Sequence, residues 1–523
     1  MAIKVVKRET LKVYGLNVKQ QEIVKDSLTV TNPAYLSAKR FSKWNNVRIP
    51  KFLTFYDVHK DCMELPLGYD LSDILTDKDE IIDERILNTV SYPQIRIGLR
   101  DKQKLAFRAW IDDTDKGIVC MPTGMGKSIL GIYCAYAMRQ KALVIVHKND
   151  LVTGWQEDCK VCFGDDIKVG LVKASKRKVG DQITIATIQT LNSWAKNDLT
   201  SFEKFVEQFG MVIVDEMHHI AGSIYDLVNH FPAYYRVGLT ATPERTDGLS
   251  DVMYWYLGKL AYKYEYEKSN KDILPVRVHI LTSKAIYDPK CYQIPTGKSK
   301  DGTEHYRYVL ESEVSAPDSK WDLVSAEDVP IKKRPRLNFA EIDDRAVTSQ
   351  MTMNTVCSSI KQSYDRGKTI VCFFSQKAHC QYYMDEMHKT YGVPLDTMCI
   401  YNGNYSREEL FERKEKIESG IYKITFTTYS IATEGTNVKA WDTAYLISSI
   451  NNGKNVEQAA GRIRRTRAGK TSVADLYDVR YPNVYALKNH KWKRDQRYKM
   501  LKFSVSEAIN PSNRAGKRFS IGY

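Results

Sequence analysis

Short hydrophobic runs alternate with longer amphipathic stretches from about residue 99 onward. Each run is only a few residues long, and polar residues or glycine follow it at once. This alternation is typical of a parallel α/β sheet, in which helices connect buried strands. The strands predicted for a first sheet are Gly117–Met121, Ala142–Val146, Ile183–Ala186, Met211–Val214 and Arg236–Leu239.

A second set of runs follows a polar stretch, residues 286–340, which is rich in Lys, Asp, Ser and Pro and is predicted to be a linker or insertion. Two tandem sheets predict two lobes, at residues 86–285 and 341–505, followed by a flexible tail at 506–523. The strands predicted for the second sheet are Thr369–Val371, Lys423–Phe426, Thr443–Leu446 and Ala474–Leu476.

The first 85 residues have a different texture, with strand-like pieces separated by turns. This texture predicts a small α+β module. The acidic segment at residues 70–84 lies between basic neighbours and is predicted to be a connector that leads out of the module. The strand-like pieces are Ile3–Val6, Ser27–Val30 and Arg48–Phe55.

Positive charge is concentrated in two parts of a chain whose formal net charge is +15. The first sixty residues contain twelve Lys and Arg against four Asp and Glu, and residues 461–500 contain twelve against three. Clustered positive charge is typical of proteins that bind a polyanion, although charge alone fits a solvated basic face equally well.

The ten cysteines are scattered through apolar runs and form no spaced framework, which favours a reducing compartment. Cys159 and Cys162 are the only close pair, and without a second half-site they are predicted to be ordinary helix positions. No apolar stretch approaches the length that spans a bilayer. We therefore expect no membrane partner and a cytoplasmic protein, located in the host cytoplasm if a phage encodes it.

A glycine-rich turn, Met121–Ser128, follows the first predicted strand and opens a helix. Its glycines let backbone N–H groups surround phosphate oxygens, its lysine reaches the terminal phosphates, and its serine hydroxyl can ligate Mg²⁺. Because Met121 departs from the generic pattern, the match alone also fits a fortuitous turn. The residues predicted to bind ATP here are Thr123, Gly124, Gly126, Lys127 and Ser128.

Two carboxylates, Asp215 and Glu216, directly follow the buried strand Met211–Val214. A bare charge at the tip of such a strand is costly unless a cation meets it. Asp215 is therefore predicted to hold Mg²⁺ together with Ser128. Glu216 is predicted to orient and deprotonate the attacking water.

Phosphoryl transfer also needs positive charge on the developing transition state. The segment Gln458–Arg465 near the end of the second sheet offers it, because Arg462 and Arg465 are three residues apart and would share a helical face. A solvated basic helix is the alternative. Gln458, Arg462 and Arg465 are assigned to catalysis with Glu216.

In this order the segments resemble the motif set of superfamily 2 helicases of the DExH type. The resemblance covers about residues 95–500. It implies an α/β fold of two RecA-like lobes with P-loop parallel sheets, which clamp ATP and Mg²⁺ at their interface, and a nucleic-acid-dependent ATPase. The matching segments are Leu99–Gln103, Pro122–Ser128, Val144–Trp155, Thr187–Leu191, Asp215–His218, Thr240–Thr242, Thr427–Asn437 and Gln458–Arg465.

The resemblance implies further roles. Gln103 would recognise adenine, Gly435 would contribute to the nucleotide site, and His218 would couple hydrolysis to movement. The residues that would contact the nucleic-acid backbone are Thr187, Thr190, Thr240, Thr242 and Thr428.

Residues 236–248 resemble the XPB-like branch, whose members act on duplex or branched DNA, and differ from the DEAD-box RNA subgroup. Residues 32–68 resemble the N-terminal module of phage recombination helicases of the UvsW type. There, Lys43, Trp44 and Arg48 combine phosphate-neutralising charge with a ring that can stack on an unpaired base. Alternatively, Trp44 is a core residue of a small domain.

The leading prediction is an ATP-dependent DNA helicase or translocase that remodels branched DNA by fork regression, Holliday-junction branch migration or D-loop unwinding. The alternatives are a transcript-release or RNA-polymerase-associated translocase, a restriction-system motor, and an ATP-switched DNA-binding or annealing protein. The sequence shows no convincing nuclease pattern, which argues against a built-in restriction nuclease. We expect a monomer that binds forked duplex and single-stranded DNA, with recombination or replication proteins as candidate partners.

Overall fold

The computed structural model forms two compact units, Met1–Glu265 and Tyr266–Tyr523. Among the residues that the model describes, no helix combines the length and the apolar character needed to cross a membrane. The described residues are 2–36, 49–112, 115–217, 227–241, 249–265, 273–298, 304–330, 333–335, 337–432, 438–451, 453–465, 470 and 472–507.

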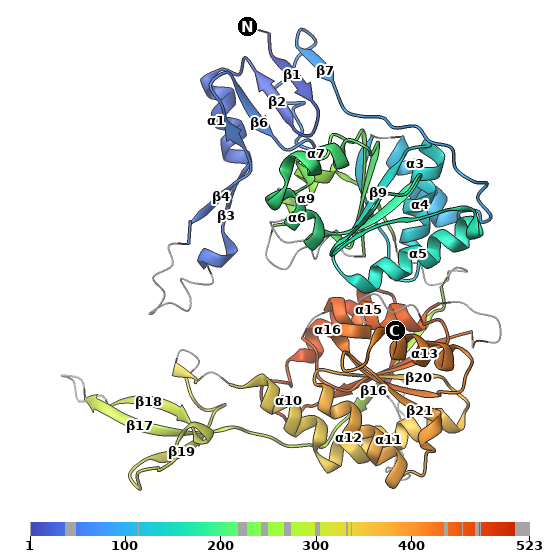
Figure 1. Cartoon of the computed structure of the whole chain (residues 1–523). Helices are drawn as coiled ribbons and strands as arrows, with labels where there is room; N and C mark the ends of the chain where they lie inside the picture. The colour runs from blue at the N-terminus through green and yellow to red at the C-terminus, as the bar shows by residue number, and fades with distance from the viewer. Residues whose placement is uncertain are drawn as a thin grey trace. The chain divides into compact units, whose positions relative to one another are not determined.

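The first unit contains an eight-stranded sheet in the order β11-β10-β12-β9-β13-β14-β8-β15 (Figure 1). Every neighbouring pair is parallel except β10 with β11. All five predicted strands are confirmed. The strands are β8 (Lys116–Cys120), β9 (Ala142–Val146), β10 (Gly170–Lys173), β11 (Lys176–Lys178), β12 (Ile183–Thr187), β13 (Met211–Asp215), β14 (Tyr235–Thr240) and β15 (Leu260–Lys263).

Helices cover both faces of this sheet because successive side chains of a strand point to opposite faces. Val212 and Val214 of β13 pack into one core cluster with α6, α7 and α9. Ile213 lies between them in sequence and approaches Gly131 of α4 on the other face. The helices are α3 (Asp101–Ile111), α4 (Lys127–Met138), α5 (Asn149–Phe163), η1 (Gly164–Asp166), α6 (Ile188–Asn197), α7 (Leu199–Val206) and α9 (Ser250–Leu257).

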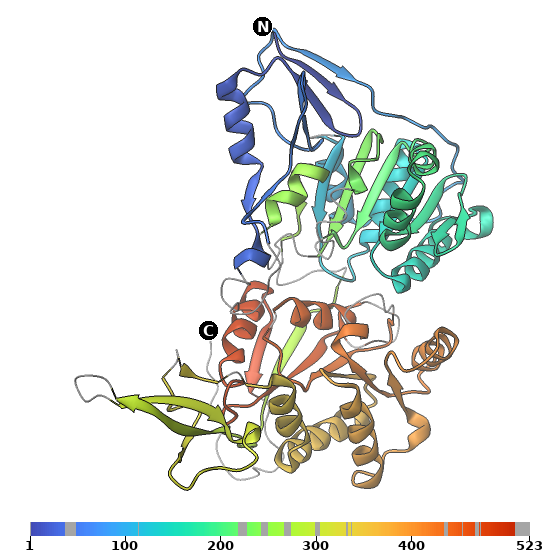
Figure 2. The ribbon, with the colours of Figure 1, turned by 60° about the vertical axis from the view of Figure 1, so that its left-hand side comes forward.

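A small module precedes this sheet, with strand order β5-β6-β2-β1-β7 and a separate two-stranded ribbon of β3 and β4, which Figure 2 shows leading away from the sheet. Residues 70–84 were expected to be a connector, and this prediction is wrong. Leu71 and Ile74 lie in the module's core and outweigh the exposed acids around them. The elements are β1 (Lys4–Lys7), β2 (Leu11–Tyr14), α1 (Val18–Ser27), β3 (Thr29–Thr31), β4 (Phe52–Thr54), β5 (Asp57–Val58), β6 (Cys62–Leu65) and β7 (Glu80–Asp83).

A fully buried arginine joins this module to the eight-stranded sheet. Arg236 of β14 donates from Nη2 to the carbonyl oxygen of Glu9 at 2.9 Å, and from Nη1 to that of Tyr256 at 3.0 Å. Burial lowers the pKa of this guanidinium to about 9. At a second point of contact, a Cβ added to Gly68 would lie 2.5 Å from the carbonyl oxygen of Tyr254, so the two backbones meet closely.

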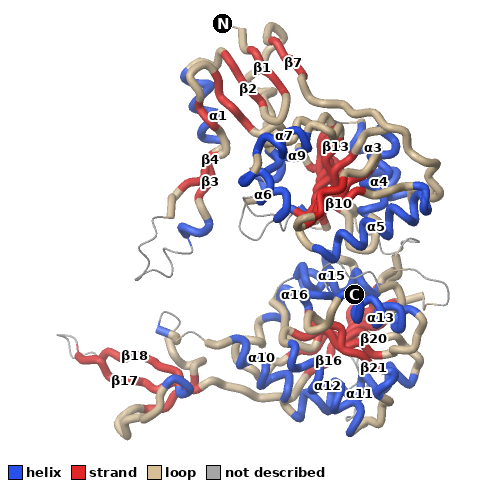
Figure 3. The backbone as a smooth tube through the Cα atoms, in the orientation of Figure 1, coloured by secondary structure: helices blue, strands red, loops and turns tan. Residues whose placement is uncertain are grey.

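The second unit contains a seven-stranded parallel sheet in the order β21-β22-β20-β23-β24-β16-β25 (Figure 3). The four predicted strands of the second set are confirmed, and with the first sheet they establish the predicted α/β class with two RecA-like lobes. The strands are β16 (Val276–Thr282), β20 (Ile370–Phe374), β21 (Met398–Tyr401), β22 (Ile424–Thr428), β23 (Thr443–Leu446), β24 (Ala474–Arg480) and β25 (Ser504–Glu507).

The predicted boundary between the lobes needs a correction. Residues 276–282 were assigned to the first lobe, but β16 pairs with β24 along its whole length and with β25 on its other edge. The strand is placed by partners about two hundred residues away, which local patterning does not reveal. The helices of the second unit are α10 (Phe339–Thr348), α11 (Gln350–Asp365), α12 (Lys377–Lys389), η5 (Leu395–Thr397), α13 (Arg407–Glu418), α14 (Tyr429–Ala432), α15 (Gly453–Ile463) and α16 (His490–Met500).

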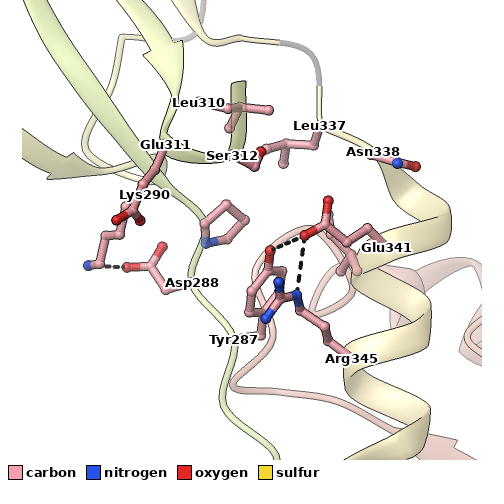
Figure 4. Close-up of a pocket in the computed structure, with 12 residues that line it drawn as sticks. Tyr287, Asp288, Lys290, Leu310, Glu311, Ser312, Leu337, Asn338, Glu341 and Arg345 are labelled. Carbon is pink, nitrogen blue, oxygen red and sulfur yellow. Dashed lines mark hydrogen bonds and ion pairs between the residues drawn. The ribbon is translucent and has the colours of Figure 1, made fainter. Parts of the chain in front are cut away.

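The segment predicted as a linker or insertion carries its own antiparallel sheet, in the order β18-β17-β19. At its root, where it meets α10, a pocket of about 260 Å³ contains Tyr287, Glu341 and Arg345 (Figure 4). Glu341 accepts hydrogen bonds from the Tyr287 hydroxyl at 3.4 Å and from Arg345 Nε at 3.2 Å. The elements are β17 (Lys290–Lys298), β18 (Glu304–Leu310), η3 (Glu311–Glu313) and β19 (Asp322–Ser325).

We predict that Arg236→Met lowers the free energy of unfolding by about 3 kcal/mol, because buried carbonyl oxygens lose their donors. Thermal unfolding of the full chain, with proteolysis of the N-terminal module as a second readout, measures this. Arg277→Met, at an exposed arginine of β16, is the matched control. Equal unfolding temperatures for the two variants would contradict the stabilising role of Arg236 between the module and the sheet.

Candidate nucleotide-binding site

The glycine-rich turn connects the end of β8 to the start of α4. Gly124 and Gly126 have φ angles of 90° and 75°, in the left-handed region that glycine adopts without a steric penalty. Gly126 is the N-cap of α4, so Lys127 and Ser128 lie in the helix's first turn. The first N–H groups of such a helix have no partner within the helix and carry partial positive charge, which suits a phosphate.

Lys127 and Glu216 lie close together in the structure, although they are far apart in sequence. The Lys127 Nζ atom is 3.4 Å from Glu216 Oε1 and donates to the carbonyl oxygen of Met121 at 3.3 Å. Glu216 follows β13 with a φ of 48°, a strained value for a residue with a Cβ. The predicted phosphate-binding lysine and the predicted general base therefore form one charged pair.

Asp215 is 4% exposed at the tip of β13. Its Oδ2 accepts from the Trp155 indole at 2.8 Å, and its Oδ1 accepts from the Glu216 backbone N–H at 2.9 Å. Burial raises the pKa of this carboxyl to about 6, the charge of Glu216 adds to the increase, and Lys127 opposes it. A carboxylate whose charge is this costly is suited to a hard cation such as Mg²⁺, and the Ser128 hydroxyl supplies the same class of oxygen ligand.

Trp155 is a contributor that the sequence analysis did not identify. It lies on α5 at the end of the segment Val144–Trp155, which was matched as a motif without a role for this residue. The available signal was that a buried indole N–H needs an acceptor. His147, near the start of the same segment, is half-buried. Partial burial lowers the pKa of its imidazole, and the nearby charge of Glu216 opposes this effect.

Gln103 directly contacts the glycine-rich turn Met121–Ser128, which is called the phosphate loop below. Its Nε2 donates to the carbonyl oxygens of Met125 at 3.2 Å and Gly126 at 2.9 Å, while its Oε1 accepts from the Arg100 backbone N–H at 2.8 Å. Gln103 thus supports the loop from behind, and its role in adenine recognition stays a prediction. A cavity of about 560 Å³ adjoins α3 and α4; its lining includes Arg96, Phe107 and Tyr133.

Among the predicted nucleic-acid contacts of the first unit, Thr187 and Thr240 lie at strand ends and Thr190 lies in the first turn of α6. The Thr187 and Thr190 hydroxyls are 2.9 Å apart, and Thr190 also accepts from the Ala174 backbone N–H at 2.9 Å. Thr240 is fully buried at the end of β14, where its carbonyl oxygen accepts from the Met121 backbone N–H at 2.9 Å. This hydrogen bond connects the end of β14 directly to the phosphate loop.

In the second unit, Gln458 and Arg462 are buried on α15, and the Thr428 hydroxyl lies 3.1 Å from that of Ser430. The expectation that Arg462 and Arg465 share a helical face is wrong, because α15 ends at Ile463. Arg465 instead forms an antiparallel bridge with Ile273. Tertiary pairing therefore ends the helix within the predicted motif, although the catalytic roles of these arginines stay predictions.

Six predicted site residues and two structural expectations remain. The six lie outside the described residues: Lys43, Trp44, Arg48, His218, Thr242 and Gly435. The predicted tail begins inside β25, so its first two residues are strand. Cys159 and Cys162 are buried without a disulfide on α5, as ordinary helix positions would be.

We predict that Trp155→Phe lowers Mg²⁺-dependent nucleotide affinity by about tenfold, because a hydrogen bond to a buried carboxylate is lost. Titration of a fluorescent ATP analogue over a range of Mg²⁺ concentrations measures the effect. Trp441→Phe is the matched control, since that buried indole donates to the Thr425 hydroxyl at 3.2 Å. An equal loss of affinity in both variants would show general destabilisation.

Comparisons with known proteins agree with this geometry. Residues 96–245 match the family model described as "Type III restriction enzyme, res subunit". The chain is 25% identical over 411 residues to the DNA 3'-5' translocase XPB2 of Sulfurisphaera tokodaii, which covers 76% of this chain and 86% of the relative. It is 25% identical over 425 residues to the probable helicase D10 of Escherichia phage T5, which covers 80% of each chain.

Similar arrangements occur among solved structures. The restriction-modification enzyme LlaBIII, solved bound to DNA, aligns with 82% of this chain and 32% of its own at 13% identity and a TM-score of 0.54, which indicates a shared fold. T4 UvsW aligns with 97% of this chain and 99% of its own at 16% identity and a TM-score of 0.38.

The phosphate loop, the paired carboxylates and the two largely parallel sheets occur in a chain that aligns over most of its length with one relative named as a translocase and another named as a probable helicase. The chain therefore resembles superfamily 2 helicases of the DExH type, and the XPB branch and phage helicases are among its relatives.

Proposed function

We propose that this enzyme is an ATP-dependent DNA helicase or translocase that remodels branched DNA in recombination, replication or repair. The observation that carries the motor part of the proposal is the contact of Lys127 with Glu216 beside the buried Asp215. DNA as the track is supported by the relative named as a DNA translocase and by the neighbour solved bound to DNA.

In the proposed cycle Lys127 exchanges partners. Its ammonium is paired with Glu216 at 3.4 Å, and the more strongly charged triphosphate of ATP would draw it away. Glu216, released from this pair, would accept a proton from the attacking water. Trp155 and the Glu216 backbone N–H would hold Asp215 in orientation throughout.

Mg²⁺, when bound, would neutralise charge on the phosphates as they separate, with Asp215 and Ser128 as the residues suited to hold it. Arg462 and Arg465 would supply further positive charge, and Gln458 would assist them as a neutral hydrogen-bond donor. The Met121 backbone N–H donates a hydrogen bond to the carbonyl oxygen of Thr240, which is a predicted DNA contact. A conformational change of the phosphate loop would therefore shift this end of β14. Repeated binding of ATP and release of its products would then move the DNA strand along the enzyme.

This mechanism predicts recognition of DNA shape rather than sequence. Contacts with phosphates carry little sequence information, and they weaken steeply as salt increases. Forks and four-way junctions are the proposed substrates, because they present duplex and single-stranded backbone together. Fork regression, branch migration and D-loop unwinding are the corresponding reactions.

Among the alternatives, a restriction motor is favoured by the shared fold with LlaBIII, but the sequence shows no convincing nuclease pattern. An ATP-switched binding protein would not need a general base held beside the phosphate loop. A transcript-release translocase would share the whole motor, so only substrate preference separates it from the proposal.

We predict that ATP turnover is stimulated most by forked or four-way DNA, less by plain duplex or single strands, and least by RNA. Steady-state ATPase measurements on all five nucleic acids provide the comparison. Glu216→Gln should bind ATP normally and hydrolyse it at least about 100-fold more slowly, which separates this enzyme's activity from a contaminant. Strongest stimulation by RNA would overturn the DNA assignment.

We predict that substituting both Lys43 and Trp44 by Ala lowers affinity for forked DNA at least about fivefold, because a phosphate contact and a stacking ring are lost. Basal ATPase activity should not change. The control pair is Val18→Ala with Lys19→Ala, two exposed positions on α1 of the same module. Fluorescence anisotropy of a labelled fork measures affinity, and equal loss in both pairs would contradict a specific contact.

A further inference from the structure

Helix α16 has two faces of opposite character. The side chains of His490, Arg494 and Tyr498, four residues apart, are buried. The opposite face is exposed and includes the positively charged residues Lys491, Lys493 and Lys499. A helix with one buried and one basic face is fixed to the protein on one side and available to an anionic ligand on the other.

The buried face fixes the helix firmly to the second sheet. Arg494 Nη1 is 2.7 Å from Asp478 Oδ1 on β24, and both side chains are almost completely buried. His490 Nδ1 lies 3.0 Å from the Ser449 hydroxyl, and its ring stacks on Phe339 with centroids 6.1 Å apart. Burial lowers the pKa of His490 to about 4, so its charge is absent at neutral pH.

The same helix is connected to the helix that carries Arg462. Arg497 Nη2 of α16 lies 2.6 Å from Glu457 Oε2 of α15, and both groups are largely buried. A Cβ added to Gly453, the first residue of α15, would lie 3.5 Å from the Arg497 side chain. Helices α15 and α16 are therefore held together by a buried ion pair and by close packing.

The exposed face carries a tryptophan whose surface is mostly accessible to solvent. Trp492 is 64% exposed, whereas Trp110, Trp155 and Trp441 are fully buried. Among the seven tryptophans that the structure describes, the other six are buried or half-buried. An indole in water exposes a large apolar surface, and this arrangement suits a planar apolar ligand such as a nucleobase.

The charge around Trp492 is strongly positive. Residues 488–502 contain a single acid, Asp495, and seven Lys and Arg, of which Lys488, Arg494 and Arg497 are held in ion pairs. The other four are the exposed residues Lys491, Lys493, Lys499 and Lys502. The carboxylate of Asp495 pairs with Arg480. Because its charge is neutralised by this pair, Asp495 would repel an anion at the exposed face only weakly. Lys491 and Lys493 flank the ring in sequence, and Lys499 lies two helical turns further along, about 10 Å away. Phosphates on either side of a stacked base would meet these ammonium groups.

We propose that the exposed face of α16 binds an unpaired nucleic-acid strand, with a base stacked on Trp492 and phosphates neutralised by Lys491, Lys493 and Lys499. This site rests on the proposed function and adds to the predicted threonine contacts. Through the Arg497–Glu457 pair, a strand held here is held by the same rigid body as Arg462.

The test compares variants of the full chain in binding to a labelled single strand and to a blunt duplex, by fluorescence anisotropy at several salt concentrations. Trp492→Ala should weaken single-strand binding at least about fivefold and affect the duplex much less, because stacking needs an unpaired base. Trp492→Phe should restore most of the affinity. Lys491→Gln with Lys493→Gln should reduce the slope of log affinity against log salt by about 1.4 for a single strand.

The matched control is Phe411→Ala, which removes a 54% exposed aromatic ring from helix α13 of the same unit. It should leave binding unchanged. Unchanged single-strand affinity in Trp492→Ala, or an equal loss for single strand and duplex, would overturn the proposed site. If the wild-type chain binds neither nucleic acid, the proposed function fails. The wild-type measurement therefore separates failure of the proposed function from failure of the proposed site.

Discussion

The burial of one carboxylate, Asp215, is the constraint on which the functional part of the molecule depends. Isolated, a charge there would be too costly, and the protein offsets this cost with the Trp155 indole, the Glu216 backbone N–H and the ammonium of Lys127. These groups come from three different segments of the first unit. The compensation for one buried charge thus brings together the residues that we propose to take part in ATP hydrolysis.

Buried guanidinium groups play the corresponding role in joining secondary parts to each sheet. Arg236 connects the N-terminal module to the first unit through backbone carbonyl oxygens, and Arg494 connects α16 to β24 through Asp478. Such contacts are directional and tolerate little displacement, because a misplaced buried charge loses its partners. Arg236 thus fixes the N-terminal module, and Arg494 fixes α16, to the sheet beside it.

Much of the fold was predictable from local patterning. The buried strands of both sheets are short apolar runs, and the phosphate loop lies between one of them and a helix, as the glycine spacing indicates. Predictions failed where a distant partner decides the structure. Residues 276–282 join the second sheet through β24, and Arg465 leaves its helix because the chain pairs with Ile273.

By itself, the sequence determined the class of fold and the order of the motifs. It also singled out Lys127, Asp215 and Glu216 as the charged residues of the candidate nucleotide site, because spacing along a strand or a turn is a local property. Only the tertiary structure decided that Trp155 orients Asp215, that Gln103 supports the phosphate loop, and that Trp492 is exposed on a fixed helix. These facts depend on which side chains meet across the fold. Burial, and the pairing that burial requires, are set by the packing of segments that are remote in sequence.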